Sequence, residues 1–273
     1  MTTGSYTWDN AMLEGRRRLA LLERALDPST FRRLDAIGVR PGWRCLDVGA
    51  GGGTVVEQLC RRVGAKGRVT AVDLDARFLR ALELANLEIS EANIVAMELP
   101  VGAFDLVHAR WTLMHIVERE LVLRKLVAAL APGGTLFLEE PDALPVMTID
   151  RSGWHDLSMR VFEIIAQRGS KSDWARDLPH ALAPLGLADV RAEAAFTYFP
   201  GGGELAEFWK LSWARVRDGV AAAGSDVSQW DRELAQLDDP SRLFAGPMTV
   251  SVIASKPGSA VNPRAPAPAE SDS

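Results

Sequence analysis

The residues of this chain whose types and spacing point most directly to chemistry lie in segment 45–53, which reads C-L-D-V-G-A-G-G-G. Its apolar start predicts a short buried strand, with Asp47 near the end. Gly49, Gly51 and Gly53 then turn the chain into a helix that begins at Thr54. Glycines let a ligand approach the backbone closely, and the free N–H groups at a helix start form a polar concavity. The segment therefore predicts a small-molecule site, with a turn that binds no ligand as the alternative.

A second acidic residue follows at the position where a nucleoside ligand needs one. Residues 69–73 read V-T-A-V-D, which predicts a second strand that ends in Asp73. An ionised carboxylate at the tip of that strand is placed to accept hydrogen bonds from both hydroxyls of a ribose. The dinucleotide fingerprint G-x-G-x-x-G is not met, because threonine stands at position 54. The glycine turn and the acid, in this order, are more specific together than either is alone.

Four motifs together resemble the class I methyltransferases that use S-adenosylmethionine. They are D-x-G-x-G-x-G at 47–53, F-D-L-V-H-A-R at 104–110, L-x-H-I at 113–116 and L-A-P-G-G-T-L-F-L-E-E at 130–140. The resemblance covers residues 44–141. It is strongest to small-molecule enzymes of bacterial metabolism, a group that includes ubiquinone- and menaquinone-type methyltransferases and natural-product tailoring enzymes.

The resemblance implies S-adenosyl-L-methionine as the cofactor and S-adenosyl-L-homocysteine as the product. The methionine portion is expected at the glycine turn, the ribose at Asp73, and the adenine against Leu74. Family members often carry an aspartate in the place of Asn93, whose neutral side chain is a weaker acceptor. The expected cofactor-binding residues are Asp47, Gly49, Ala50, Gly51, Gly53, Asp73, Leu74, Asn93 and Ile94, with Ala109 and Arg110 beside the sulfonium.

Methyl transfer from a sulfonium is a one-step displacement from an activated donor, so positioning and exclusion of water supply much of the catalysis. A base is needed only when the acceptor must lose a proton. The candidates are His155, His115 and Glu140. The alternatives are a structural packing role for His115, and a substrate-binding or helix-capping role for Glu140.

The chain holds eight tryptophans, which is a high number for its 273 residues. We expect at least half of those that follow the fourth strand to be core residues, while the others suit an aromatic or polyketide-like acceptor. The expected substrate-binding residues are Trp111, Trp154, Met159, Trp174, Trp209 and Trp213. Four histidines without a pair at ligand spacing predict no metal site. The hypothesis is methylation of an oxygen or carbon in bacterial secondary metabolism.

These motifs must be positioned by an α/β fold, a Rossmann-like, mostly parallel sheet of seven strands with helices on both faces. Residues 1–42 are expected to form two helices, divided at Pro28, that cover the cofactor site, with Tyr6, Trp8 or Arg17 reaching the cofactor. Residues 43–257 are the expected methyltransferase domain, with helical cap segments near 152–186 and 204–238. Residues 258–273 are rich in Pro, Ala and Ser and are expected to be disordered.

Composition limits the remaining function classes. The net charge is −5 and no basic stripe occurs, which argues against a nucleic-acid partner. Two isolated cysteines and the lack of a signal or membrane segment favour a cytoplasmic protein, a monomer or homodimer that acts on a small molecule. Two rivals stay open: an enzyme of the same fold that catalyses a non-methylating step such as cyclisation, and a non-catalytic binding module.

Overall fold

The computed structural model describes residues 13–150, 154–222, 224 and 226–258. Within them lies a seven-stranded sheet in which β9 alone runs opposite to the other six strands. From edge to edge the strands are β3 (Leu87–Glu91), β2 (Arg68–Asp73), β1 (Arg44–Val48), β4 (Phe104–Arg110), β5 (Leu130–Asp142), β9 (Met248–Ser255) and β6 (Ala188–Ala195). A separate pair joins β7 (Tyr198–Pro200) to β8 (Leu243–Ala245). The predicted fold class is confirmed.

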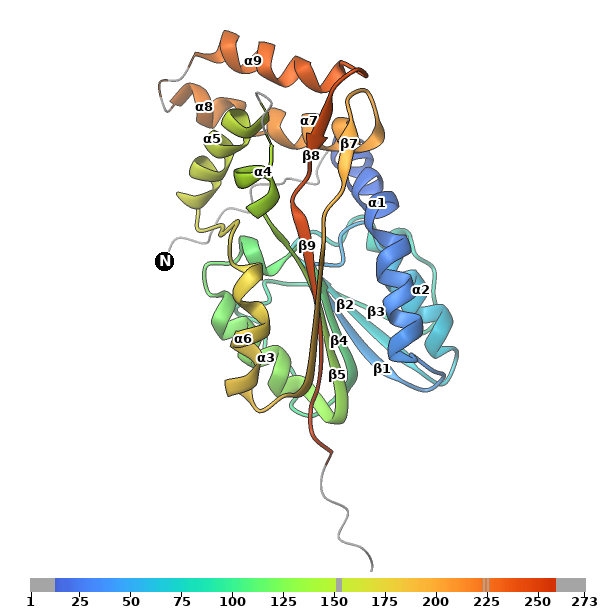
Figure 1. Cartoon of the computed structure of the whole chain (residues 1–273). Helices are drawn as coiled ribbons and strands as arrows, with labels where there is room; N and C mark the ends of the chain where they lie inside the picture. Colours follow the sequence, from blue (N-terminus) through green and yellow to red (C-terminus); the bar gives the residue numbers. More distant parts are fainter. Residues whose placement is uncertain (1–12, 151–153, 223, 225, 259–273) are drawn as a thin grey trace, which may run out of the picture.

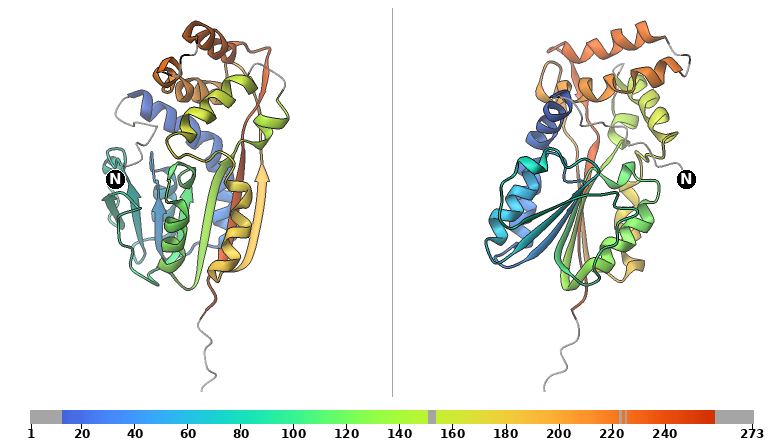
Figure 2. Two further views of the ribbon diagram at one scale, coloured as in Figure 1. Left: turned by 90° about the vertical axis from the view of Figure 1, so that its left-hand side faces the viewer. Right: turned by 180° about the vertical axis from the view of Figure 1, so that it is seen from behind.

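Helices cover both faces of the sheet and extend beyond its carboxyl end. In Figures 1 and 2, α1 (Leu13–Ile37) and α2 (Thr54–Val63) lie on one face, and α3 (Arg119–Ala129) and α6 (Leu178–Leu182) lie on the other. A helical cap stands beyond the strand ends, built from α5 (Trp154–Ala166), α7 (Glu204–Ala214), α8 (Arg217–Ala222) and α9 (Val227–Ala235), with the short α4 (Leu144–Thr148) leading into it. Single 3₁₀ turns occur at Leu79–Ala81, Leu113–His115, Ala175–Asp177, Ala183–Leu185 and Gln236–Asp238.

The first helix differs from its prediction. A proline inside a helix removes one hydrogen bond, and two helices were therefore expected. The structure instead has one helix of 25 residues that contains Pro28. Leu21 and Leu34, on either side of the proline, are both fully buried. Burial of such side chains contributes about 1.5–3 kcal/mol each, which offsets the lost bond and keeps the helix continuous.

Three apolar clusters hold the layers together. One lies between the sheet and α3 with α6, and a second between the sheet and α1 with α2. The third fills the cap and is rich in aromatic residues, with Trp154, Trp213 and Phe244 among its buried members. The cap therefore has a core of its own, which fixes it over the strand ends. Among the described residues, no helix has the length and apolar character needed to cross a membrane.

The predicted division of the chain stays a prediction. The expected disordered tail and the aromatic residues Tyr6 and Trp8 lie outside the described residues, apart from Gly258 at the start of the tail. The segment after Asp73 forms only the 3₁₀ turn at Leu79–Ala81 before β3, and β6 ends at Ala195.

Candidate functional site

The glycine turn brings the backbone of β1 close to the end of β4. Gly49, Gly51 and Gly53 all have positive φ, at +71°, +56° and +92°. A Cβ on Gly49 would lie 2.0 Å from Oγ1 of Thr112. This position therefore requires glycine for two reasons, its backbone conformation and the approach of the neighbouring loop. The turn then leads directly into the first residue of α2.

Asp73 supports the glycine turn from the end of β2. Its Oδ2 accepts a hydrogen bond from the N–H of Gly51 at 2.8 Å, and its Oδ1 accepts one from the N–H of Asp75 at 3.0 Å. Burial raises the pKa of Asp73, and these two bonds act against the rise. Each carboxylate oxygen keeps a further lone pair for a ribose hydroxyl. Leu74 follows with an exposed side chain, as an adenine contact requires.

Three strands place a row of buried charged side chains beneath the turn. Nδ1 of His108 lies 2.5 Å from Oδ1 of Asp47, its partner in the β1–β4 register. Nε2 of His108 lies 3.6 Å from Oε2 of Glu139 on β5. Burial acts to lower the pKa of His108, but the two carboxylates outweigh it and raise the pKa to about 9. The residue is therefore an imidazolium between two carboxylates at neutral pH.

Helix α1 completes this buried row. Oε2 of Glu139 accepts a hydrogen bond from Thr30 at 2.6 Å, and its Oε1 accepts one from Ser251 at 3.2 Å. Burial acts to raise the pKa of Glu139, yet His108 and Arg110 hold it below its ordinary value. The guanidinium of Arg110 lies 2.9 Å from the Asp27 carboxylate. The side chain of Arg110 thus binds to α1.

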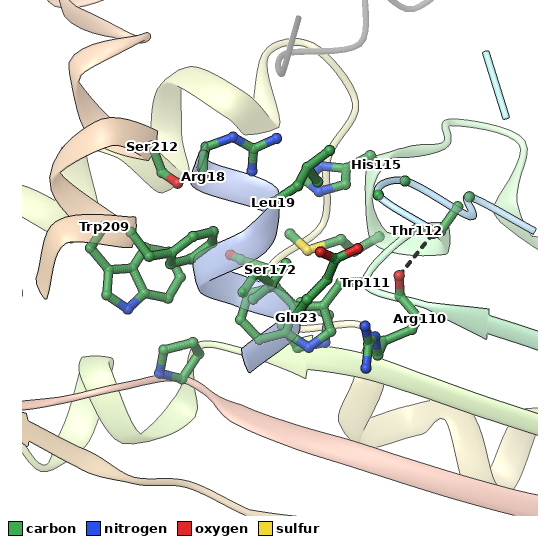
Figure 3. Close-up of a pocket in the computed structure, with 18 of the residues that line it drawn as sticks. Arg18, Leu19, Glu23, Arg110, Trp111, Thr112, His115, Ser172, Trp209 and Ser212 are labelled. Atoms are coloured by element: carbon green, nitrogen blue, oxygen red, sulfur yellow. Dashed lines mark hydrogen bonds between the residues drawn. The ribbon is translucent and has the colours of Figure 1, made fainter. Parts of the chain in front are cut away.

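A pocket opens above the glycine turn, between α1, the end of β4 and the cap (Figure 3). The space between these walls, open solvent at the mouth included, is about 1030 Å³. The predicted residues in its lining are Asp47, Gly49, Ala50, Gly51, Arg110, Trp111, His115, Trp209 and Trp213.

Two charged residues of α1 line the pocket and were not predicted. Arg18 and Glu23 are both largely buried, and burial raises the pKa of the Glu23 carboxyl. The Glu23 carboxylate pairs with Arg16 at 3.2 Å. The guanidinium of Arg18 is therefore the group in this wall that matches the carboxylate of an amino-acid ligand. Arg17, the arginine singled out from the sequence, instead pairs with Glu207 at 2.5 Å on the surface. The missed signal was the position of Arg18, one helical turn before Leu22 on the apolar face of α1.

The structure separates the three candidate bases. His115 lines the pocket, with its Nδ1 3.3 Å from Oγ of Ser170. Burial, with the positive charges of Arg18 and Arg119, lowers the pKa of His115 to about 3, so its imidazole is neutral. Among the three candidates, His115 alone belongs to the pocket lining.

Glu140 and His155, the other two candidate bases, both lie outside the pocket lining. The buried carboxylate of Glu140 accepts hydrogen bonds from the N–H groups of Thr112, Leu113 and Met114 at 2.9–3.1 Å. Burial nevertheless raises its pKa to about 7. Its position matches the capping alternative. His155 is half-buried on α5, and its Nδ1 lies 2.9 Å from Oδ1 of Asp156, outside the pocket lining.

The other predicted residues divide between pocket and core. Trp154 donates to the carbonyl of Ala245 inside the cap core, and Trp174 donates to Glu120 near α3. Both are buried away from the pocket lining, which also leaves out Met159, Asp73, Leu74, Asn93, Ile94 and Ala109. The side-chain oxygen of Asn93 accepts from the N–H of Val95, and Ala109 is fully buried within the sheet. The pocket lining thus covers the expected methionine and acceptor ends rather than the adenine end. Unpredicted lining residues include Leu19, Thr112, Met114, Phe162, Phe208 and Ser212.

A glycine cradle at the switch point of the sheet, an acid at the tip of β2 and the Arg18 guanidinium in the pocket wall fit S-adenosylmethionine. The fold and this site define a class I methyltransferase domain that uses this cofactor. Residues 46–138 match the family model described as "Methyltransferase domain".

Named relatives agree with this class. The chain is 36% identical over 124 residues to the ubiquinone biosynthesis O-methyltransferase of Xanthomonas campestris, which covers 41% of this chain and 50% of the relative. It is 31% identical over 115 residues to the ubiquinone/menaquinone biosynthesis C-methyltransferase of Hahella chejuensis, and this alignment covers 39% of this chain and 46% of the relative. The chain thus spans about half the length of the curated relatives it matches.

Solved structures share the fold over more of the chain. The YcgJ protein of Bacillus subtilis superposes with a TM-score of 0.59 at 13% identity, covering 85% of this chain and 99% of that one. Phosphoethanolamine N-methyltransferase 2 of Haemonchus contortus superposes with a TM-score of 0.52 at 18% identity, covering 89% and 52%. At these identities the likeness concerns the fold.

Proposed function

We propose that the protein transfers a methyl group from S-adenosylmethionine to an oxygen or carbon of a small organic acceptor. The acceptor class is an aromatic or polyketide-like molecule, and the setting is bacterial secondary metabolism. The observation that carries this proposal is the aromatic wall of the pocket. Trp111, Trp209 and Trp213 stand beside the glycine turn, where flat apolar surfaces suit an aromatic ring.

Each part of the pocket has a task in this reaction. Bound S-adenosylmethionine supplies an activated methyl group on a sulfonium. Asp73 and the glycine turn hold the nucleoside and methionine parts, while Arg18 pairs with the methionine carboxylate. The tryptophans exclude water and fix the acceptor in line, which is the main catalytic requirement.

His115 is the proposed base for acceptors that lose a proton. It lies in the pocket as a neutral imidazole, the form of histidine that can take a proton. Its basicity is low because Arg18 is one of the charges that lower its pKa. An anionic group that pairs with Arg18 therefore makes His115 a stronger base. The relatives' names, which refer to O-methylation and C-methylation in quinone biosynthesis, support a ring-bearing acceptor.

The first test is calorimetric titration with S-adenosylmethionine and, separately, with S-adenosylhomocysteine. Micromolar binding of both is expected, followed by transfer of labelled methyl to an aromatic acceptor. Absence of binding to either ligand refutes the proposal. Consumption of an acceptor without incorporation of label favours the cyclisation alternative, and cofactor binding without any turnover favours a binding module.

A further inference from the structure

A second cavity shares a wall with the pocket and has no role in the methyl transfer described above. Its empty volume is about 750 Å³. Leu22, Trp111, Trp209 and Pro247 line both spaces. The second cavity lies against α1, the ends of β5 and β9, and the segment between β6 and β7. The two spaces are therefore neighbours, and the indole rings of Trp111 and Trp209 belong to the walls of both.

Trp111 is held in an unusual conformation at this division. Its φ is +52°, which is costly for a bulky side chain and persists only where the surroundings impose it. Its backbone N–H donates to the carbonyl of Glu139 at 2.7 Å. Its indole N–H donates to Oγ1 of Thr249, a residue of the second cavity, at 3.2 Å. The strained backbone thus sets the indole in the walls of both spaces.

The lining of the second cavity is apolar with one polar end. Leu26, Phe199 and Leu205 add to the apolar walls. The polar end holds Arg33 and Glu139, whose charged atoms lie 3.7 Å apart. Because the charges of Arg33 and Glu139 compensate each other, the cavity offers no unpaired charge to a ligand. It therefore favours an uncharged ligand with a long apolar part over a charged one.

The mouth of the cavity is also apolar. Ala25 on α1 and Ala195 at the end of β6 stand at its rim with exposed side chains. Phe196, another lining residue, is 39% exposed, and its ring lies 5.4 Å from that of Tyr198. An apolar molecule therefore meets aromatic surface before it enters.

We propose that the second cavity binds the apolar, non-reacting part of the acceptor. The acceptor is an uncharged molecule whose reacting ring lies in the pocket and whose alkyl extension passes Trp111 and Trp209. This inference rests on the proposed function and adds to it the shape of the substrate. It makes chain length, rather than charge, the property by which the enzyme selects its acceptor.

The test uses 4-alkylphenols, from 4-methylphenol to 4-octylphenol, as probes. Their affinity for the protein saturated with S-adenosylhomocysteine is measured by calorimetry. For the wild type, each added methylene that enters the second cavity tightens binding by about fourfold. Ala25→Trp narrows that cavity without touching the pocket, because Ala25 belongs to the lining of the second cavity alone. The affinity of the Ala25→Trp variant for the alkylphenols is expected to stop rising at a shorter alkyl chain than in the wild type. Its affinity for 4-methylphenol is expected to equal that of the wild type.

Two further variants keep the result interpretable. Ala195→Trp narrows the same cavity from β6 and is expected to give the same early plateau. Ala128→Trp, at an exposed position of α3 on the opposite face of the sheet, is the matched control and keeps the wild-type series. The same chain-length dependence in all four proteins overturns the inference, as does the absence of phenol binding. If the wild type does not bind S-adenosylhomocysteine, the proposed function itself is refuted.

Discussion

Removal of His108 is expected to destabilise the protein more than any surface substitution. His108→Phe leaves the buried carboxylates of Asp47 and Glu139 without the cation between them. Removing one partner of a buried ionic group costs about 3–5 kcal/mol, because the remaining charge has no compensation. The same substitution at His155, which is half-buried and lies outside the pocket lining, is the matched control and is expected to stay within about 0.5 kcal/mol.

The effect of this substitution also depends on pH. The folded-state pKa of His108, about 9, lies above its ordinary value of 6.5, so its contribution is complete below pH 6.5 and is lost as pH rises through 9. This rise corresponds to roughly 3 kcal/mol. The lowered pKa of Glu139 adds a contribution that is present above pH 4.5 and is lost as pH falls through its folded-state value. The stability difference between wild type and His108→Phe is therefore largest between about pH 5 and 6.5.

Urea unfolding at pH 6, 7.5 and 9.5 measures both statements. The difference between wild type and His108→Phe is expected to narrow steadily across this series, whereas His155→Phe tracks the wild type. A cost below about 1 kcal/mol at pH 6, or a difference that does not change with pH, refutes the assignment of an imidazolium to this position.

Three further substitutions test the site. Asp73→Ala is expected to weaken S-adenosylhomocysteine binding by about 1.5–3 kcal/mol in calorimetry, whereas Asp75→Ala leaves it nearly unchanged; equal losses contradict the ribose assignment. Gly49→Ala is expected to lower both stability and cofactor affinity. Gly186→Ala, at a left-handed position with open space around the added Cβ, is the control and is expected to cost only about 1–2 kcal/mol in thermal unfolding; similar costs contradict the close approach to the loop after β4. Because the folded-state pKa of Glu140 is raised to about 7, the stability of the wild type is expected to fall as pH rises from 4.5 to 7. Glu140→Gln is expected to remove that fall; if the variant's stability changes with pH as the wild type's does, the role of Glu140 in this fall is refuted.

The sequence predicted the parts of the fold and site that depend on local pattern. The glycine turn, the acid at the end of β2 and the run of alternating strands and helices follow from short segments. Asp73 was found because a carboxylate at a strand tip is a positional signal that needs no tertiary information. The continuity of α1 was not found, because Pro28 is a local signal and the burial of Leu21 and Leu34 is a tertiary one.

The remainder of the site depends on contacts between distant segments. The charged role of His108 cannot be predicted from the sequence, because neither Asp47 nor Glu139 is near it in the chain, although the sheet register makes all three neighbours. Trp154 and Trp209 look alike in the sequence, yet one is enclosed in the cap core and the other faces the pocket. Composition reveals that tryptophans are abundant, whereas only packing decides which of them face a ligand.

The single helix α1 has a consequence for how the site opens. It supplies Arg18 and Glu23 to the pocket wall, and further along it supplies Thr30 to the buried carboxylate of Glu139. Separation of α1 from the sheet would expose both cavities and break that buried bond together. Local unfolding of α1 therefore costs much of the global stability, and its amide protons belong with the slowly exchanging core. Ligand entry and product release are then left to movements of the cap segments, while the helix at their base stays fixed.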